Sequence, residues 1–287
     1  MLKELLNFLL HYKILNLFVR LIISHTDNYS NVNKLKRETK IIVSMSAEEE
    51  DFGNLKYTLF SVFNQKIAPD NVVLWISDKY ELSDLPYSVT RYIKNGLDVR
   101  FVNDIGTFTK ILYALKEFED CIIVTADENI YYPKNWLAKL YLSYISCPND
   151  IHAHSVADVM CKGDKLDSVT KWKKFAGMEK AGYNYFPLET GGVLYPPNCF
   201  IREISREDIY RKKLKTSWDI WSWIIALMSD RKIRLVKSHI KNFTTVNIFK
   251  SLKKYNHYTG RTNITDKQLT QLFEYYGNNI SSKLTKK

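Results

Sequence analysis

The residues best suited to chemistry follow one short apolar run in the first half of the chain. The run CIIVT, residues 121–125, leads into Asp127, Glu128 and Asn129, and then into two tyrosines and Pro133. Hard divalent cations bind carboxylate and amide oxygens and complete their coordination with substrate phosphates. Asp127 and Asn129 are therefore candidate ligands for Mg²⁺ or Mn²⁺ held against a diphosphate, whose growing charge the metal would neutralise as it leaves. The alternative is an Asx turn that caps the next helix.

The surrounding pattern predicts an α/β fold. Apolar runs at residues 40–46, 71–77, 98–104 and 121–127 alternate with stretches of helical period. Strands this short and apolar favour a mostly parallel sheet covered by helices on both faces. In open sheets of this kind the ligand lies outside the carboxyl ends of the strands, so we expect the polar residues that follow the strands to form one site.

Three clusters of polar residues follow the predicted strands. Ser44 and Ser46 follow the first strand, Asp104 the third, and Asp127, Glu128 and Asn129 the fourth. Chance could place one such cluster, whereas three on one edge of the sheet indicate a site.

The pattern after residue 150 is weaker. Residues 151–160 resemble a strand, on which His152 and His154 alternate; packing is the favoured role of these two over metal binding. Residues 217–228 predict a Trp-rich helix. The last forty or so residues are polar and basic, with a helix expected at 266–277 and a loose tail after it.

The charge balance indicates an anionic partner. The chain has 287 residues and a formal charge of +11, which favours nucleic acid, a phosphate-bearing small molecule or an anionic membrane surface. No RNP, helix-turn-helix or zinc-finger pattern is present, so we expect no nucleic-acid partner. Four isolated cysteines fit a reducing compartment, which suggests the cytoplasm.

The N-terminal residues 1–24 are apolar but interrupted by charges, with no uninterrupted run of about 20 apolar residues. They predict an amphipathic helix that lies on a membrane surface, or one that packs on the domain or on a partner chain. We divide the chain into this helix with its linker (1–39), one α/β domain (40–245) and a basic helical extension (246–287).

Several ordered motifs resemble bacterial GT-A glycosyltransferases. IIVTADENIYYPKNWLAKLY, residues 122–141, resembles their strand and DxD segment, and NDIGTFTKILYAL, residues 103–115, resembles their DxGPxxKxxyAL segment. GGVLYPP, residues 191–197, matches their late loop, and WDIWSW, residues 218–223, resembles their DDIWxW helix start. The resemblance covers roughly residues 40–245 and is to inverting, family-2-like enzymes that build surface polysaccharides.

The resemblance implies a GT-A, Rossmann-like fold and a nucleotide-sugar donor bound with Mn²⁺ or Mg²⁺. It places Asp127 and Glu128 at the donor. Ser44 and Ser46 would face the nucleotide base, or would only end the strand. Asp104 would bind uracil or ribose, or cap the following helix. Lys110, in the first turn of that helix, would contact the nucleotide or its diphosphate as a point charge, or would be an ordinary exposed lysine.

The resemblance also assigns roles to residues in the second half of the chain. Asp219 would be the general base that deprotonates the acceptor hydroxyl, or else a helix N-cap, a role that Ser217 could fill equally well. Gly191 and Gly192 would form a loop beneath the sugar or acceptor, or a tight turn.

Aromatic residues near these motifs are candidates for stacking on sugar rings. Tyr195, Trp218 and Trp221 are the three expected at the acceptor or sugar, although most Trp on an apolar helix face belongs to the core.

The resemblance also implies a setting. The expected activity is hexosyl transfer (EC 2.4) to a glycan or lipid-linked acceptor in lipopolysaccharide, O-antigen or capsule synthesis, at the inner face of the cell membrane. Three departures favour an alternative, a degenerate domain that binds sugar nucleotide or glycan without turnover. The first is AEEED, residues 47–51, whose acids follow the first strand and would repel a diphosphate if they pointed inward. Asn129 stands where the family has a third acid, and Trp218 stands where it has the first acid of DDIW.

Overall fold

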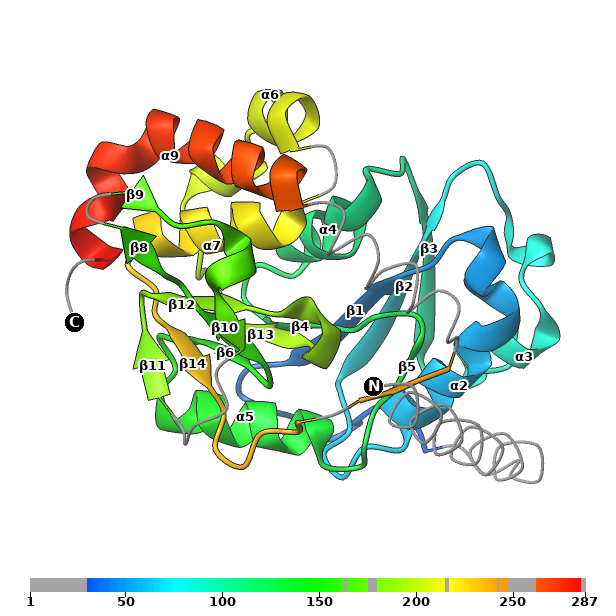
Figure 1. Ribbon diagram of the computed structural model, residues 1–287. Coiled ribbons are helices and arrows are strands. Elements are labelled where there is room, and N and C mark those ends of the chain that lie inside the picture. Colours follow the sequence, from blue (N-terminus) through cyan, green and yellow to red (C-terminus); the bar gives the residue numbers. More distant parts are fainter. Residues whose placement is uncertain are drawn as a thin grey trace, which may run out of the picture.

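The fold was analysed in a computed structural model of the chain. The structure describes residues 30–162, 165–174, 180–214, 217–241, 243–246 and 262–284. Within these ranges, strands and helices alternate over the first half of the chain, and short strands are more frequent after residue 150 (Figure 1).

An eight-stranded sheet forms the centre of the molecule (Figure 1). In spatial order its strands are β11 (Lys180–Gly182), β14 (Ile233–Leu235), β6 (Ile151–Ala153), β13 (Val193–Tyr195), β4 (Ile122–Thr125), β1 (Ile41–Ser46), β2 (Asn71–Ser77) and β3 (Leu97–Val102). Strands β3, β2, β1 and β4 are parallel neighbours, and β14 is parallel to β6. β13 runs antiparallel between β4 and β6, and β11 is antiparallel to β14. The predicted α/β fold with a mostly parallel, Rossmann-like sheet is confirmed.

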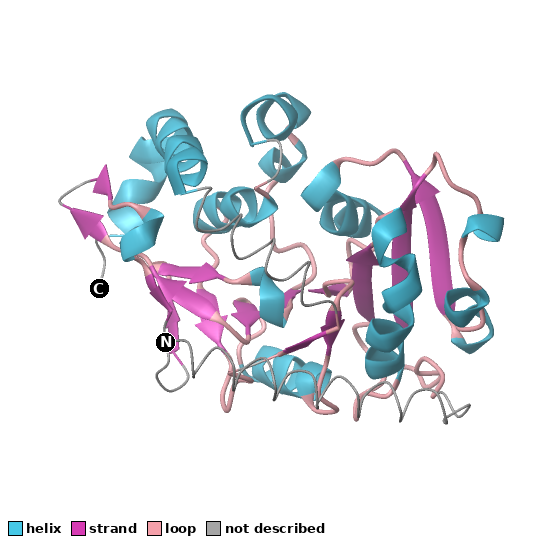
Figure 2. Ribbon diagram, turned by 45° about the vertical axis from the view of Figure 1, so that its right-hand side comes forward, coloured by secondary structure: helices cyan, strands magenta, loops and turns pink. Residues whose placement is uncertain are grey.

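Helices cover both faces of this sheet (Figures 1 and 2). They are α2 (Phe52–Phe63), α3 (Tyr87–Thr90), α4 (Thr109–Glu117), α5 (Trp136–Ser146), α6 (Glu207–Ile209), α7 (Trp218–Met228) and α9 (Thr262–Leu284). One face shares a core with α4, α7 and α9, and the other with α2 and α5. Ile41 and Val43 face the second core and Ile42 faces the first, because successive strand residues point to opposite faces. This two-sided burial explains the continuous apolar runs of the strands.

The region after residue 150 differs from the sequence prediction. The single strand expected at 151–160 is wrong: the chain turns at His154 and Ser155, so that β6 stays in the central sheet. The next strand, β7 (Val156–Asp158), instead pairs with β10 (Lys173–Lys174) and β12 (Tyr185–Pro187) in a small sheet. The turn lets one apolar stretch contribute to two sheets.

Two further short pairs lie outside the central sheet. β5 (Ile130–Tyr131) pairs with β15 (Thr244–Thr245), and β8 (Cys161–Lys162) pairs with β9 (Lys165–Leu166). The first of these pairs brings the chain near residue 245 against the loop that follows β4.

The C-terminal helix is longer than expected and belongs to the core. α9 continues to Leu284, so the loose tail predicted from residue 278 is wrong as far as that residue. Leu272 and Ile280 are fully buried in the same core cluster as α7. The predicted N-terminal helix, residues 1–24, lies outside the described residues. Among the described helices, none is long and apolar enough to cross a membrane.

Candidate active site

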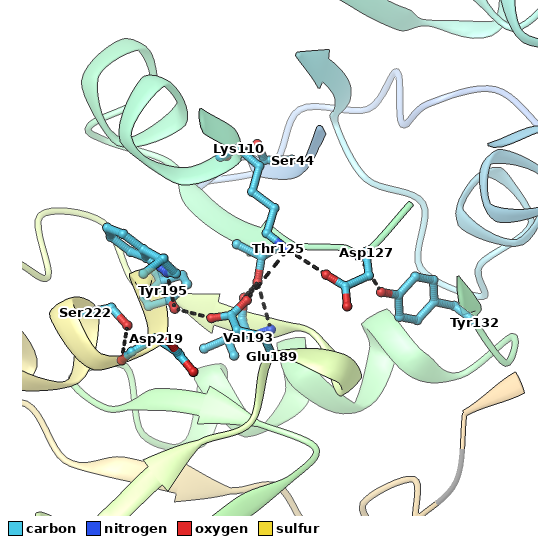
Figure 3. A network of polar contacts seen from close by, with 11 residues as sticks. Ser44, Lys110, Thr125, Asp127, Tyr132, Glu189, Val193, Tyr195, Asp219 and Ser222 are labelled. Atoms are coloured by element: carbon cyan, nitrogen blue, oxygen red, sulfur yellow. Dashed lines mark hydrogen bonds and ion pairs between the residues drawn. The ribbon is translucent and has the colours of Figure 1, made fainter. Parts of the chain in front are cut away.

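Lys110 and Asp127 meet at the carboxyl edge of the parallel strands (Figure 3). Asp127 follows β4 by two residues, and Lys110 lies in the first turn of α4, which packs on β1 and β4. The ammonium of Lys110 donates to Oδ1 of Asp127 at 2.7 Å, and the two side chains are 11% and 8% exposed. The alternative of an exposed lysine is therefore wrong. Asp127 does not cap α5 either, because that helix has Asn135 as its N-cap residue.

Lys110 is held as a cation. Burial by itself lowers its pKa, but the carboxylates of Asp127 and Glu189 outweigh burial and raise the pKa of Lys110 above its ordinary value. The hydroxyl of Ser44 donates to the Lys110 carbonyl and accepts from Nε1 of Trp75 at 2.8 Å. Ser44 is fully buried and links the start of α4 to β1, and its contact with a nucleotide base stays a prediction.

Glu189 completes this cluster, although its sequence position suggested no role. Its Oε1 accepts from the Tyr195 hydroxyl at 3.0 Å, and its Oε2 accepts from the Thr125 hydroxyl at 3.2 Å. Oε2 also lies 3.9 Å from Nζ of Lys110, and the side chain is 18% exposed. Burial raises the pKa of Glu189; Lys110 opposes this, and the negative charge of Asp127 adds to it. Glu189 belongs to none of the motifs in the sequence. The only local indication of a role is that an acid stands two residues before Gly191 and Gly192.

The two glycines explain how Glu189 reaches the cluster. Gly192 has φ +76°, and a Cβ atom there would lie 2.7 Å from the Thr125 carbonyl and 2.7 Å from the Trp136 ring. Nε1 of Trp136 donates to the Gly191 carbonyl at 2.7 Å. The tight-turn alternative therefore holds for this loop. Its backbone is pressed onto the end of β4, which places Glu189 beside Thr125 and Lys110.

The three aromatic candidates lie inside the core. Tyr195 and Trp221 are 0% exposed and Trp218 is 2% exposed, so no ring face is open to a sugar in this conformation. The three rings pack in the core, and their stacking on a sugar stays a prediction. Nε1 of Trp218 donates to the Tyr195 hydroxyl at 3.3 Å, and Nε1 of Trp221 donates to the Ile204 carbonyl at 2.9 Å.

Asp219 lies on the opposite side of Glu189 from Asp127 (Figure 3). It is the second residue of α7, its Oδ1 accepts from the Ile220 N–H at 3.0 Å, and its charge contributes to the raised pKa of Glu189. Ser217 does not cap the helix through its side chain, because its hydroxyl donates to Gln268 at 2.6 Å. The structure thus places the predicted base next to the cluster, and its catalytic role stays a prediction.

Asp104 forms an Asx turn just before α4. Its Oδ1 accepts from the Gly106 N–H and from the Thr109 hydroxyl, both at 2.9 Å. The N-cap position of α4 belongs to Phe108, so Asp104 is not its N-cap residue, and a nucleotide contact stays a prediction. Ser46 is half-buried at the last position of β1, and its predicted contact with the base is likewise untested.

The two histidines pack in the interior, as predicted. Nδ1 of His152 is 2.9 Å from the Ser143 hydroxyl, and Nε2 of His154 is 3.1 Å from the Trp136 carbonyl. Burial lowers the pKa of each to about 3, so both are neutral near pH 7.

The loop after β4 contains the residues predicted to hold a metal ion together with a substrate diphosphate. Glu128 and Asn129 are 9% and 3% exposed, and their main-chain carbonyls accept from Thr58 and Val246. Among the described residues, no group of three His, Cys, Asp or Glu side chains forms a preformed metal site. Mg²⁺ in nucleotide sites needs only one or two carboxylates, because substrate phosphates and water supply the rest. The Asp127 carboxylate is compatible with this requirement, and metal binding by Asp127 and Asn129 stays a prediction.

A cavity of about 300 Å³ lies near the α7 side of the cluster, lined by Ile105, Phe108, Tyr210 and Arg211. Phe108 stacks on Tyr210 at 5.0 Å and meets the Trp218 ring edge-on at 5.7 Å. This cavity has an aromatic wall and one cationic side chain.

Comparisons with known proteins found partial similarity to solved structures. Neither the family models nor the curated proteins match the sequence. Among solved structures, a mannosyltransferase, PcManGT from Pyrobaculum calidifontis in complex with GDP-Man and Mn²⁺, has a TM-score of 0.33 at 14% identity, over 50% of this chain and 45% of that one. Residues 1–349 of S. aureus TarS give 0.48 at 17% identity, over 71% and 59%. A 4-diphosphocytidyl-2C-methyl-D-erythritol synthase gives 0.33 at 16%, over 48% and 72%. The chain spans less than two thirds of the first two, and these similarities assign it no activity.

Proposed function

We propose that this protein is a glycosyltransferase that moves a sugar from a nucleoside-diphosphate donor to a hydroxyl group of an acceptor, with inversion at the anomeric carbon. The observation that carries the proposal is the buried Lys110–Asp127–Glu189 cluster at the carboxyl edge of the parallel strands. A protonated lysine beside a carboxylate at this edge suits a ligand that brings a diphosphate and a metal ion.

The donor side of the proposed site consists of Lys110 and the loop after β4. Lys110 would contact the diphosphate, and Asp127, with Asn129 and Glu128 beside it, would hold Mn²⁺ or Mg²⁺ against the phosphates. When bound, the metal stabilises the negative charge on the departing diphosphate. The charges of Asp127, Glu128 and Glu189 all act on Lys110. This acidic surrounding favours a donor that brings its own divalent cation.

The acceptor side is formed by the residues around the start of α7. Asp219, the base predicted from the sequence, and Glu189 lie near each other there (Figure 3). In an inverting transfer one carboxylate takes the acceptor proton while the acceptor oxygen attacks the anomeric carbon.

The sequence resemblance supports a finer proposal. We place the reaction in lipopolysaccharide, O-antigen or capsule synthesis, as transfer of a hexosyl group to a glycan or a lipid-linked acceptor at the inner face of the membrane. The charge of +11 suits an anionic surface. If the N-terminal residues bind that surface, the full chain sediments with anionic vesicles more strongly than a chain starting at Lys40; equal sedimentation of the two contradicts membrane binding.

The test of the activity is release of nucleoside diphosphate from UDP- and GDP-sugars with Mn²⁺. Asp127→Asn should lower turnover by at least about 100-fold, because it removes the carboxylate proposed to hold the metal. Glu119→Gln is the matched control, since Glu119 is an exposed acid three residues before the opposite end of β4. Equal losses in both variants, or turnover that survives Asp127→Asn, would contradict the proposed donor site.

Binding without turnover is the second candidate function. It is motivated by Asn129 and Trp218, which stand where the resembling family has acids. Selective thermal stabilisation by a nucleotide sugar, together with no release of nucleoside diphosphate from any donor, would establish this alternative and exclude the enzyme.

A further inference from the structure

Glu189 is the acid of the Lys110–Asp127–Glu189 cluster to which the sequence analysis assigned no role. Its carboxylate lies between the donor side, through Lys110 Nζ at 3.9 Å, and the acceptor side, where the charge of Asp219 acts on it. Figure 3 shows it between the Lys110–Asp127 pair and the start of α7. Under the proposed function, a group in this position would be next to both the diphosphate and the incoming hydroxyl.

Both oxygens of Glu189 are held by rigid elements. The Thr125 hydroxyl, on the last residue of β4, donates to Oε2, and the Tyr195 hydroxyl, on the last residue of β13, donates to Oε1. β4 and β13 are neighbours in the central sheet. A carboxylate fixed by adjacent core strands keeps its position during a reaction, as a catalytic group requires.

Trp218 determines the direction of the Tyr195 hydrogen bond. An indole N–H can only donate, and Nε1 of Trp218 donates to the Tyr195 oxygen at 3.3 Å. The single proton of Tyr195 is then directed to Glu189. Trp218, which stands where the resembling family has an acid, is therefore connected through the Tyr195 hydroxyl to the carboxylate of Glu189.

Asp219 is held differently. Its Oδ1 accepts from the N–H of the next residue, and its carbonyl accepts from the Ser222 hydroxyl. These contacts fix it to the first turn of α7, whereas Glu189 is fixed to the edge of the sheet beside Lys110.

We propose that Glu189 is the general base of the transfer and that Asp219 orients the acceptor, an inference that rests on the proposed function. In the step, the acceptor O–H proton moves to Glu189 as the acceptor oxygen forms its bond to the anomeric carbon. The bond from that carbon to the β-phosphate oxygen breaks, and its electron pair leaves with the diphosphate. Glu189 then releases the proton to water, so no further reactant is needed.

The proton affinity of Glu189 suits this role. Burial raises its pKa, and the groups that face it modulate the shift: Lys110 and Tyr195 lower it, and Asp127 and Asp219 raise it. A base whose pKa is closer to neutrality is a better proton acceptor at pH 7 than an ordinary carboxylate.

The experiment compares Glu189→Gln with Asp219→Asn in the full chain. Hydrolysis of UDP-glucose, UDP-N-acetylglucosamine and GDP-mannose is followed as release of UDP or GDP, with water as the acceptor. Donor-site binding is followed as thermal stabilisation by UDP and GDP with Mn²⁺. We expect Glu189→Gln to lower kcat at least about 100-fold, the range of a lost general base, with stabilisation by the nucleotide within about 3-fold in apparent affinity. Asp219→Asn should lower kcat less than about 10-fold, because it leaves the base in place.

Chemical rescue separates a base from a structural acid. Glu189→Ala leaves room for a small carboxylate, so sodium formate should restore part of the lost turnover, and the same salt should not restore Asp219→Ala. Thermal unfolding confirms that each variant is folded. Rescue requires proton transfer by the added ion, and a residue that only supports the fold gives no such signal.

Each other outcome overturns the assignment in a recognisable way. If Glu189→Gln keeps a third or more of kcat, or loses nucleotide binding as severely as turnover, Glu189 is not the base. A larger loss in Asp219→Asn than in Glu189→Gln returns the role to Asp219. If the unmodified chain neither binds UDP or GDP nor releases them from any donor, the proposed function itself fails, and the assignment fails with it.

Discussion

Replacing Lys110 by Met tests whether the cluster is a buried charge site. The change removes the ammonium that donates to Asp127 at 2.7 Å, where the two side chains are only 11% and 8% exposed. Met keeps most of the apolar stem, so the lost charge dominates the effect. Removing one partner of a buried ion pair leaves an uncompensated charge and costs about 3–5 kcal/mol in the free energy of unfolding. With an unfolding entropy of about 2.1 cal/mol/K per residue, 287 residues convert that loss into a decrease in Tm of about 5–8 °C.

The assay is urea unfolding followed by tryptophan fluorescence, with Lys171→Met as the matched control. Lys171 also pairs with an acid, Asp167, at 2.9 Å, but its side chain is 62% exposed. Exposed pairs contribute about 0–1 kcal/mol, so the control should stay near the unmodified chain. A double change, Lys110→Met with Asp127→Asn, should recover at least about 1 kcal/mol, because the stranded carboxylate is gone.

The pH dependence adds a second criterion. The neighbouring carboxylates raise the pKa of Lys110 above 10.5 despite its burial. Its contribution to stability is therefore fully present below pH 10.5 and is lost as the pH rises through the raised pKa. The difference between the two proteins should be constant from about pH 7 to 9 and shrink only in stronger alkali. A loss in Lys110→Met no larger than in Lys171→Met would refute the reasoning, since the pair would then behave as if solvent screened it.

Three further predictions concern the elements around the cluster. Gly192→Ala should lower the free energy of unfolding by about 2 kcal/mol or more, because of left-handed strain and a Cβ placed 2.7 Å from the Thr125 carbonyl. Gly53→Ala in α2 has open space around it and should raise the free energy of unfolding by about 0.5–1 kcal/mol. Equal effects of the two changes would show that the turn at Gly192 is not constrained. Because burial lowers the pKa of His152 to about 3, the stability linked to neutral His152 should be lost as the pH falls from 6.5 toward 3, by at most about 1.4 kcal/mol per pH unit, and His152→Gln should flatten that loss in urea titrations at several pH values. The pKa of Glu189 is raised, so the native state binds its proton more tightly than the unfolded state does. The unmodified chain should therefore lose stability as the pH rises above 4.5, and Glu189→Gln should gain stability relative to it over that range. A stability difference between the two proteins that stays unchanged from pH 4 to 8 would contradict the raised pKa.

If the last prediction holds together with a loss of turnover, Glu189 lowers stability and supports activity. Active sites commonly show this exchange, because a group positioned for reaction is held where a neutral residue would be more stable. The same pair of measurements also separates the enzyme from the binding-only alternative, in which Glu189→Gln would be more stable and otherwise unchanged.

The local pattern of the sequence was sufficient for the α/β framework. Strands β1 and β2 and helix α7 lie within a few residues of their predicted ranges, because apolar period depends on residues close in the chain. The expectation that polar residues gather at the carboxyl edge also came from the sequence, since parallel strands bring their ends together. Asp127 and Lys110 were both expected there.

The tertiary structure decided which side chains complete the cluster. Glu189 and Thr125 are 64 residues apart and meet because Gly192, with φ +76°, lets the turn before β13 press onto β4. Tyr195 and Trp218 point into the core rather than toward a sugar because β13 is enclosed between two strands and covered by α7. The residues close to each of these positions in the sequence do not predict such contacts, because the contacts depend on the packing of distant segments. The sequence therefore determined where a site should lie, and the packing of distant segments determined which acid occupies its centre.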